Sequence, residues 1–184
     1  MNQSMYIYEI NDSLDPLFCE HVIARFESGA PSDAFEADVL LQALEEGCRR
    51  YAADVLDALP ASSSDVFQAD NVRDSNTGFR VTKSICELED RAEKWQNPSQ
   101  HSGSHSRYVA YKWFLNEPRH CITRFPCADV LPRTGKLVLF PATWTYSYKE
   151  CVTDSSELLR NIFRTPKYTI DGFVLEMYAM TACF

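Results

Sequence analysis

Apolar positions near the start of the chain recur at the spacing of an amphipathic helix. In residues 13–29 they return every three or four positions. Ser13 or Asp15, followed by Pro16, is typical of a helix start, because these side chains accept hydrogen bonds from free backbone N–H groups. Gly29 is typical of a helix end. The pattern predicts a helix between these signals.

The same spacing returns on a larger scale in residues 33–60. Asp33 is a candidate N-cap, and Pro60 marks the expected end. The pattern predicts one long amphipathic helix, with Gly47 as a position where a break can occur. Its apolar positions are Phe35, Val39, Leu40, Leu44, Cys48, Tyr51, Val55 and Leu59.

The period changes after the polar linker "ASSSD". Later segments alternate or are rich in aromatic and β-branched residues, which is typical of strands. These segments are "GFRVTKSI", "RYVAYKWFL", "KLVLF" and "KYTIDGFVLEMYAM". The segment 97–106, "NPSQHSGSHS", is expected to be a loop. Helices followed by strands, without a long linker, indicate one α+β domain over residues 1–184, mainly helical in 1–60 and with its strand-built core in 65–184.

Composition narrows the function classes. The chain is 45% hydrophobic, which suffices for one substantial core. Its formal net charge of −8 argues against nucleic acid as a partner. The seven cysteines form no CxxC pair, so we expect reduced thiols. The first residues show neither the basic nor the apolar region of a signal peptide, and no stretch approaches the length of a membrane span, so we expect a soluble, cytoplasmic protein.

Four stretches together resemble the Fe(II)/2-oxoglutarate oxygenases of the prolyl 4-hydroxylase type. They are "IYEINDSLDPLFCEHVIARF", "RYVAYKWFLNEP", "CITRFPCADVLPRTGKLVLFPATW" and "PKYTIDGFV", in the order and spacing of that family. The resemblance implies a double-stranded β-helix, or jelly roll, with supporting N-terminal helices.

Family chemistry requires two histidines and one carboxylate around the iron. The positions that align with these ligands hold Gln96, Pro98 and Tyr146, and a further family histidine aligns with Tyr148. A proline side chain cannot bind a metal, and an amide is a poor Fe(II) ligand beside imidazole. The resemblance therefore implies a degenerate triad, and we do not expect Fe(II) to bind. The two tyrosines either fill the vacated volume, which we favour, or act as phenolate ligands.

The residue types that anchor the cosubstrate in this family, in contrast, are present at the aligned positions. Lys167 aligns with the basic residue that pairs with the distal carboxylate of 2-oxoglutarate, and Thr169 with the hydroxyl that assists it. A buried lysine needs a partner, which favours a carboxylate there. The alternative is that Lys167 is an exposed lysine on an edge strand.

Two hypotheses of function follow. The first is a non-catalytic oxygenase homologue that binds a small carboxylate or a protein partner, such as an active oxygenase subunit. The second is an active hydroxylase with non-standard ligands, His101 or His105 from the loop and a nearby acid. The candidate acids are Glu87, Glu89, Asp90 and Glu93. The substrate and the oligomeric state are not predicted, although the aromatic strand 107–115 leaves room for an obligate partner.

Overall fold

A computed structural model of the chain describes residues 6–55, 76, 78–85, 87–88, 95–96, 107–119, 121–152 and 165–175. Pro98, His101, His105 and the acids at 89, 90 and 93 lie outside these residues, as does the expected helix end at Pro60. No helix in the described part is long and apolar enough to cross a membrane.

Helix α1 (Pro16–Ser28) begins and ends at the predicted signals. The Asp15 carboxylate accepts hydrogen bonds from the backbone N–H groups of Leu17, at 2.8 Å, and Phe18, at 3.4 Å. Pro16 occupies the first helical position, where its missing N–H has no cost. Gly29 ends the helix in the left-handed conformation, with φ of 71°.

Helix α2 (Ala34–Val55) is continuous, so the expected break at Gly47 is wrong. Gly47 serves packing instead, because a Cβ atom there would lie 2.5 Å from a methyl carbon of Leu137. The glycine lets the helix approach the sheet closely. A buried ion pair between Arg25 and Glu36 ties α2 to α1, with their side chains 13% and 2% exposed.

The strands form two sheets. The larger sheet has the order β1-β7-β4-β9-β2 and the smaller one β3-β8-β5-β6. All pairings are antiparallel except the short parallel pair of β3 and β8. The strands are β1 (Tyr8–Ile10), β2 (Arg80–Ser84), β3 (Glu87–Leu88), β4 (Arg107–Phe114), β5 (Cys121–Arg124), β6 (Asp129–Val130), β7 (Leu137–Pro141), β8 (Lys149–Val152) and β9 (Lys167–Leu175), with a 3-10 turn η4 (Trp144–Tyr146) before β8.

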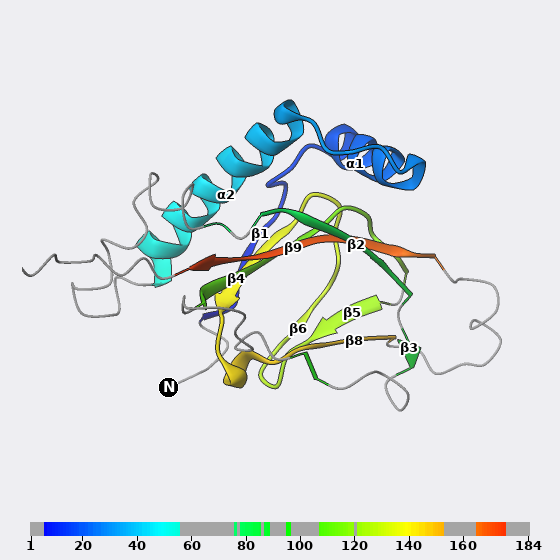
Figure 1. Ribbon diagram of the computed structural model, residues 1–184. Coiled ribbons are helices and arrows are strands. Elements are labelled where there is room, and N and C mark those ends of the chain that lie inside the picture. Colours follow the sequence, from blue (N-terminus) through cyan, green and yellow to red (C-terminus); the bar gives the residue numbers. More distant parts are fainter. Residues whose placement is uncertain are drawn as a thin grey trace, which may run out of the picture.

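The two sheets and the helices form layers. Figure 1 shows α1 and α2 on one side of the larger sheet and the smaller sheet on the other. Side chains alternate between the two faces, as a strand requires. Tyr111, Trp113 and Ile170 pack toward the helices, whereas Phe114 and Phe140 belong to a second apolar cluster. Two facing, mostly antiparallel sheets with helices outside fit the predicted jelly-roll arrangement.

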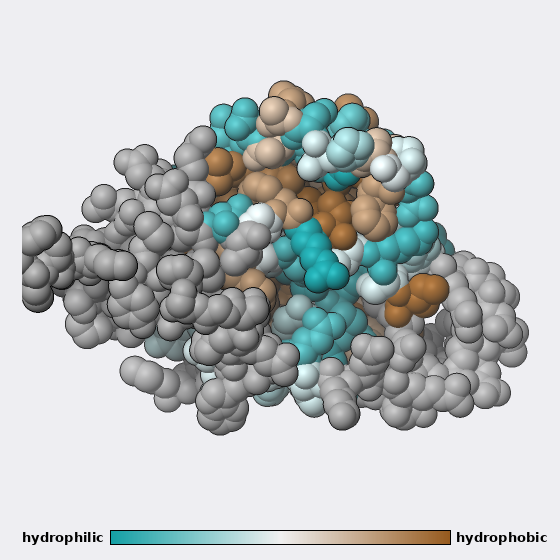
Figure 2. Space-filling view, viewed as in Figure 1, coloured by the Kyte–Doolittle hydropathy of each residue, from teal (hydrophilic) through white to brown (hydrophobic). Residues whose placement is uncertain are grey.

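The aromatic strand β4 is buried within the chain. Tyr111, Trp113 and Phe114 are each at most 1% exposed, so these three side chains offer no aromatic surface to a partner. Figure 2 shows hydrophobic residues where the helical layer meets the sheet beneath it, interspersed with hydrophilic ones. Among the residues that the structure describes, the exposed large apolar side chains are Leu17, Phe35, Ile85, Trp95 and Leu131.

The cysteines agree with the expected reduced state in part. Cys19, Cys48, Cys127 and Cys151 are reduced thiols outside any disulfide, and three of them are buried. Cys121, at the start of β5, forms a disulfide, so the expectation is wrong for this residue. Sequence spacing excludes a local CxxC pair, but it does not exclude a pair that the fold brings together.

Candidate functional site

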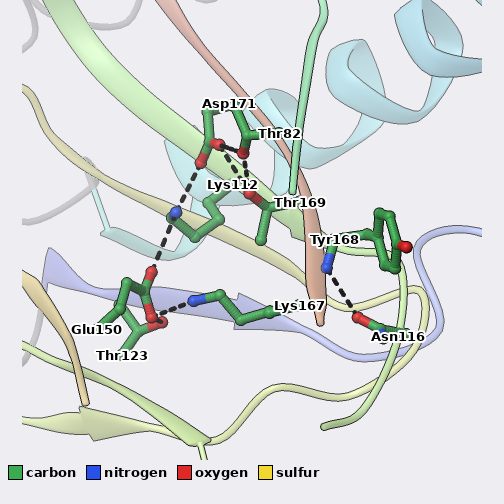
Figure 3. Close-up of polar contacts among 9 residues, drawn as sticks. All are labelled: Thr82, Lys112, Asn116, Thr123, Glu150, Lys167, Tyr168, Thr169 and Asp171. Carbon is green, nitrogen blue, oxygen red and sulfur yellow. Dashed lines mark hydrogen bonds and ion pairs between the residues drawn. The ribbon is translucent and has the colours of Figure 1, made fainter. Parts of the chain in front are cut away.

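The inward face of β9 presents Lys167, Thr169 and Asp171 to the space between the two sheets (Figure 3). They alternate with Tyr168 and Ile170, which join the helix-side core. Lys167 is only 1% exposed, and β9 lies between β4 and β2 rather than at an edge. The alternative of an exposed edge lysine is therefore wrong, and the prediction that Lys167 is buried with a carboxylate beside it agrees with the structure.

The carboxylate beside Lys167 belongs to the protein itself. Glu150, on β8 of the smaller sheet, forms an ion pair with Lys167 Nζ. Its other oxygen lies 3.2 Å from Nζ of Lys112, on β4. The Thr123 hydroxyl donates a hydrogen bond of 2.7 Å to Glu150 Oε2. Two ammonium groups and one hydroxyl therefore surround a single carboxylate, and both ion pairs connect one sheet to the other.

Asp171 forms the second half of this charge network. Its Oδ1 lies 2.7 Å from Lys112 Nζ, and the two residues are direct partners across β4 and β9. Its Oδ2 accepts hydrogen bonds from the hydroxyls of Thr82, at 2.9 Å, and Thr169, at 2.8 Å. Thr169 thus supports a carboxylate, as expected for its aligned position, but that carboxylate is an internal one. Lys112 bridges the two acids.

The electrostatics of the network follow from burial and pairing. Burial disfavours the charged form of Lys167 and lowers its pKa to about 8, although Glu150 opposes this shift. Burial alone would raise the pKa of Glu150, but Lys112 and Lys167 hold it below its ordinary value. Burial would likewise lower the pKa of Lys112, but Asp171, Tyr148 and Glu150 raise it well above the ordinary range. At neutral pH two cations and two anions balance.

Gln96, which aligns with a metal ligand, lies beside Tyr148, which aligns with the further family histidine. Gln96 and Tyr148 face each other in an antiparallel bridge, with Gln96 N–H donating to Tyr148 O at 2.7 Å. The Tyr148 ring packs against Phe125 and Phe140, and Lys112 Nζ lies 4.8 Å from its centroid. The phenol ring therefore fills interior volume beside the charge network. The register pairs Gln96 with Tyr148 rather than with Tyr146.

Tyr146 lies in the η4 turn, where its ring packs edge-on against Tyr6. Burial raises the pKa of Tyr146, and it also raises that of Tyr148 despite the opposing charge of Lys112. Both side chains are thus neutral phenols at neutral pH, and a neutral phenol is a weak metal ligand. Packing agrees with the interpretation that these tyrosines fill volume.

The described residues do not fit Fe(II). Gln96 is exposed and offers only an amide, and the tyrosines offer neutral phenols. Within the described part of the chain, no group of three or more His, Cys, Asp or Glu side chains is placed to hold a metal ion. They do not fit 2-oxoglutarate at Lys167 either, because Glu150 already occupies the contact that a ligand carboxylate would make.

Sequence reasoning identified Lys167 and Thr169. It missed the three other charged residues of the network, which are Lys112, Glu150 and Asp171. A signal for two of them was present. Lys112 and Asp171 stand in apolar strands at positions whose neighbours in sequence face the helices. A charged residue in such a strand points to an interior partner of opposite charge. Glu150 carried no comparable signal, because β8 itself was not predicted.

Comparison with known proteins agrees with the architecture. No family model matches the chain, and no curated protein matches it in sequence. A truncated viral collagen prolyl hydroxylase from Paramecium bursaria Chlorella virus-1 is 10% identical, over 94% of this chain and 90% of its own, with a TM-score of 0.54. A prolyl-4-hydroxylase from Pseudomonas putida is 13% identical, over 94% and 89%, with a TM-score of 0.56.

The viral enzyme was also solved as a complex with 2-oxoglutarate. That structure is 10% identical, covers 94% of this chain and 96% of its own, and gives a TM-score of 0.53. At identities this low, the structural match establishes a shared fold alone. The chemistry has to be argued from the residues of each chain. The chain thus has a fold like that of prolyl hydroxylases, as its four motif stretches predicted.

Proposed function

We propose that this chain is a non-catalytic protein with the prolyl hydroxylase fold, which acts as the partner subunit of an active oxygenase. The observation that carries the proposal is the Lys167–Glu150 pair. The lysine aligned with the cosubstrate anchor is buried and already neutralised by a side chain of the same protein. An incoming dicarboxylate would have to displace Glu150 from two ammonium groups and one hydroxyl.

The aligned ligand positions support the same proposal. Tyr148 fills the interior beside Lys112, and its neutral phenol replaces an imidazole. The described interior around Lys112 and Lys167 is thus occupied by protein side chains. A fold whose interior is filled by its own side chains can still bind another protein at its surface. This favours a role as a partner subunit over a role in binding small carboxylates.

The first experiment tests catalysis. The purified full chain is reconstituted anaerobically with Fe(II) and 2-oxoglutarate, its iron is measured by elemental analysis, and succinate is assayed after oxygen is admitted. A prolyl-4-hydroxylase treated identically is the positive control. We expect neither stoichiometric iron nor succinate. Near-stoichiometric iron with succinate formation would overturn the proposal, and a His101→Ala/His105→Ala variant would then test those residues as ligands.

A second experiment tests the partner. The tagged chain is purified from its native cells under mild conditions, and the recovered material is assayed for iron-dependent conversion of 2-oxoglutarate to succinate. The proposal expects this activity in the recovered complex and its loss when the partner is removed with high salt. Recovery of the chain alone, without any such activity, would contradict a role as an oxygenase subunit.

A further inference from the structure

The surroundings of Glu150 have the composition of a binding site for a free carboxylate. Its two oxygens contact Lys112, Lys167 and the Thr123 hydroxyl, which belong to three different strands. Charge-assisted contacts of this kind are the strong ones in carboxylate recognition. All three partners are buried, at 5%, 1% and 1% exposure. Their surroundings are therefore a built interior site rather than a chance surface pairing.

Lys167 retains hydrogen-bonding capacity that Glu150 does not use. An ammonium group has three donors. Among the described residues, Lys167 Nζ and Glu150 Oε1 are buried and lie in ion pairs without a well-aligned hydrogen bond. The Glu150 side chain is held by its own backbone on β8, so this covalent link limits how its carboxylate can orient toward the lysines. A free carboxylate has no such restriction.

We infer that Glu150 is a tethered occupant of a carboxylate site formed by Lys112, Lys167 and Thr123, and that this site accepts a small free carboxylate when the side chain at position 150 is shortened. The site excludes such ligands in the native chain because Glu150 occupies it. Asp171 does not compete, since Lys112, Thr82 and Thr169 hold it. The inference rests on the proposed function and extends it, because it attributes the exclusion of the cosubstrate to one side chain, that of Glu150.

The test is chemical rescue of Glu150→Ala. This variant removes the carboxylate and leaves room for an acetate ion beside Lys167, which loses its partner, and Lys112, which keeps Asp171. Chemical unfolding of the full chain is measured at neutral pH in sodium acetate and in sodium chloride of equal ionic strength. At an acetate concentration ten times its dissociation constant, the folding equilibrium constant of the variant is expected to rise roughly tenfold. The wild-type chain is expected to respond equally to both salts.

Two further variants make the test specific. Glu46→Ala makes the same change at an exposed ion pair on α2 and is expected to show no difference between the salts. Glu150→Ala/Lys167→Met keeps the cavity but removes one cation, and its acetate response is expected to be lost. Acetate, succinate and 2-oxoglutarate, titrated separately by calorimetry into Glu150→Ala, then show which carboxylate fits best.

The outcomes separate clearly. Equal stability of Glu150→Ala in acetate and chloride overturns the inference, as does an acetate response of the same size in Glu46→Ala. If Glu150→Ala does not fold in chloride, the refolding yield becomes the measurement: recovery in acetate alone supports the inference, and failure in both salts overturns it. Turnover by the wild-type chain would refute the proposed function and leave the rescue result standing, so the two failures are distinguishable.

Discussion

Replacing Lys167 with methionine is expected to change how the stability of the chain depends on pH. The structure lowers the pKa of Lys167 from 10.5 to about 8, chiefly by burial. Between these two pH values the unfolded chain binds a proton at this residue and the folded chain does not. Stability therefore rises with pH across this window. The pKa difference corresponds to a gain of about 3 kcal/mol in the free energy of unfolding.

The assay is urea unfolding followed by tryptophan fluorescence at several pH values, for the wild type and Lys167→Met. Other groups also titrate in this range. Burial raises the pKa of Cys19 to about 11 and that of Cys48 to about 12, so their ionisation in the unfolded chain lowers stability above pH 9. Because both proteins contain these thiols, their contribution cancels in the difference. The wild type should gain about 3 kcal/mol relative to Lys167→Met between pH 8 and 10.5.

A matched control is Lys83→Met on β2. Lys83 is an exposed lysine whose pKa is raised by its hydrogen bond to Glu27, so it keeps its proton in both states across the same window. The stability difference from the wild type should therefore stay flat. A flat difference for Lys167→Met as well would refute the reasoning, because it would mean that water reaches Lys167 and that its pKa is ordinary.

Two further predictions concern stability. Gly172→Ala places a methyl group where the ring and hydroxyl of Tyr111 lie, and should cost about 2 kcal/mol in urea unfolding; a cost that is unchanged when Tyr111 is also truncated to alanine would contradict this contact as the cause. Asp15→Ala removes the N-cap of α1 and should cost about 1 kcal/mol, whereas Asp15→Asn should cost much less, since an amide oxygen still accepts the bond from Leu17. Equal losses in the two Asp15 variants would exclude the cap as the cause.

The helices and long strands were predictable from sequence because their signals are local. Asp15, Pro16 and Gly29 act on the backbone next to them, and α1 has the predicted bounds. Strand β9 alternates polar and apolar residues with a period of two from Lys167 to Asp171. The short strands β5 and β8 were not predicted, because four residues carry too little periodicity to be distinguished from a loop.

The site could be predicted only as far as one strand defines it. Lys167 and Thr169 follow each other on β9, and the motif stretch around them identified both. Their actual partners depend on how the sheets face each other. Glu150 lies 17 positions before Lys167 in the chain, on the other sheet, and nothing local connects the two. The resemblance named Lys167 as the cation of the site, whereas the anion beside it, expected to be a ligand, is the Glu150 side chain.

Burying four charged residues between two sheets costs free energy, and their arrangement indicates what each pair contributes. Replacing buried ion pairs with apolar residues is often neutral or stabilising, so stability alone does not explain the network. Lys112 and Asp171 are direct partners across β4 and β9, and a slip of one residue would turn either charge toward the apolar core beneath the helices. The pair thus disfavours the wrong register. Glu150 and Lys167 have no such role within one sheet, because their contact joins two sheets. The pair instead places an anion between two buried cations at the inferred carboxylate site, which is why exchange of Glu150 for a free carboxylate is the decisive experiment.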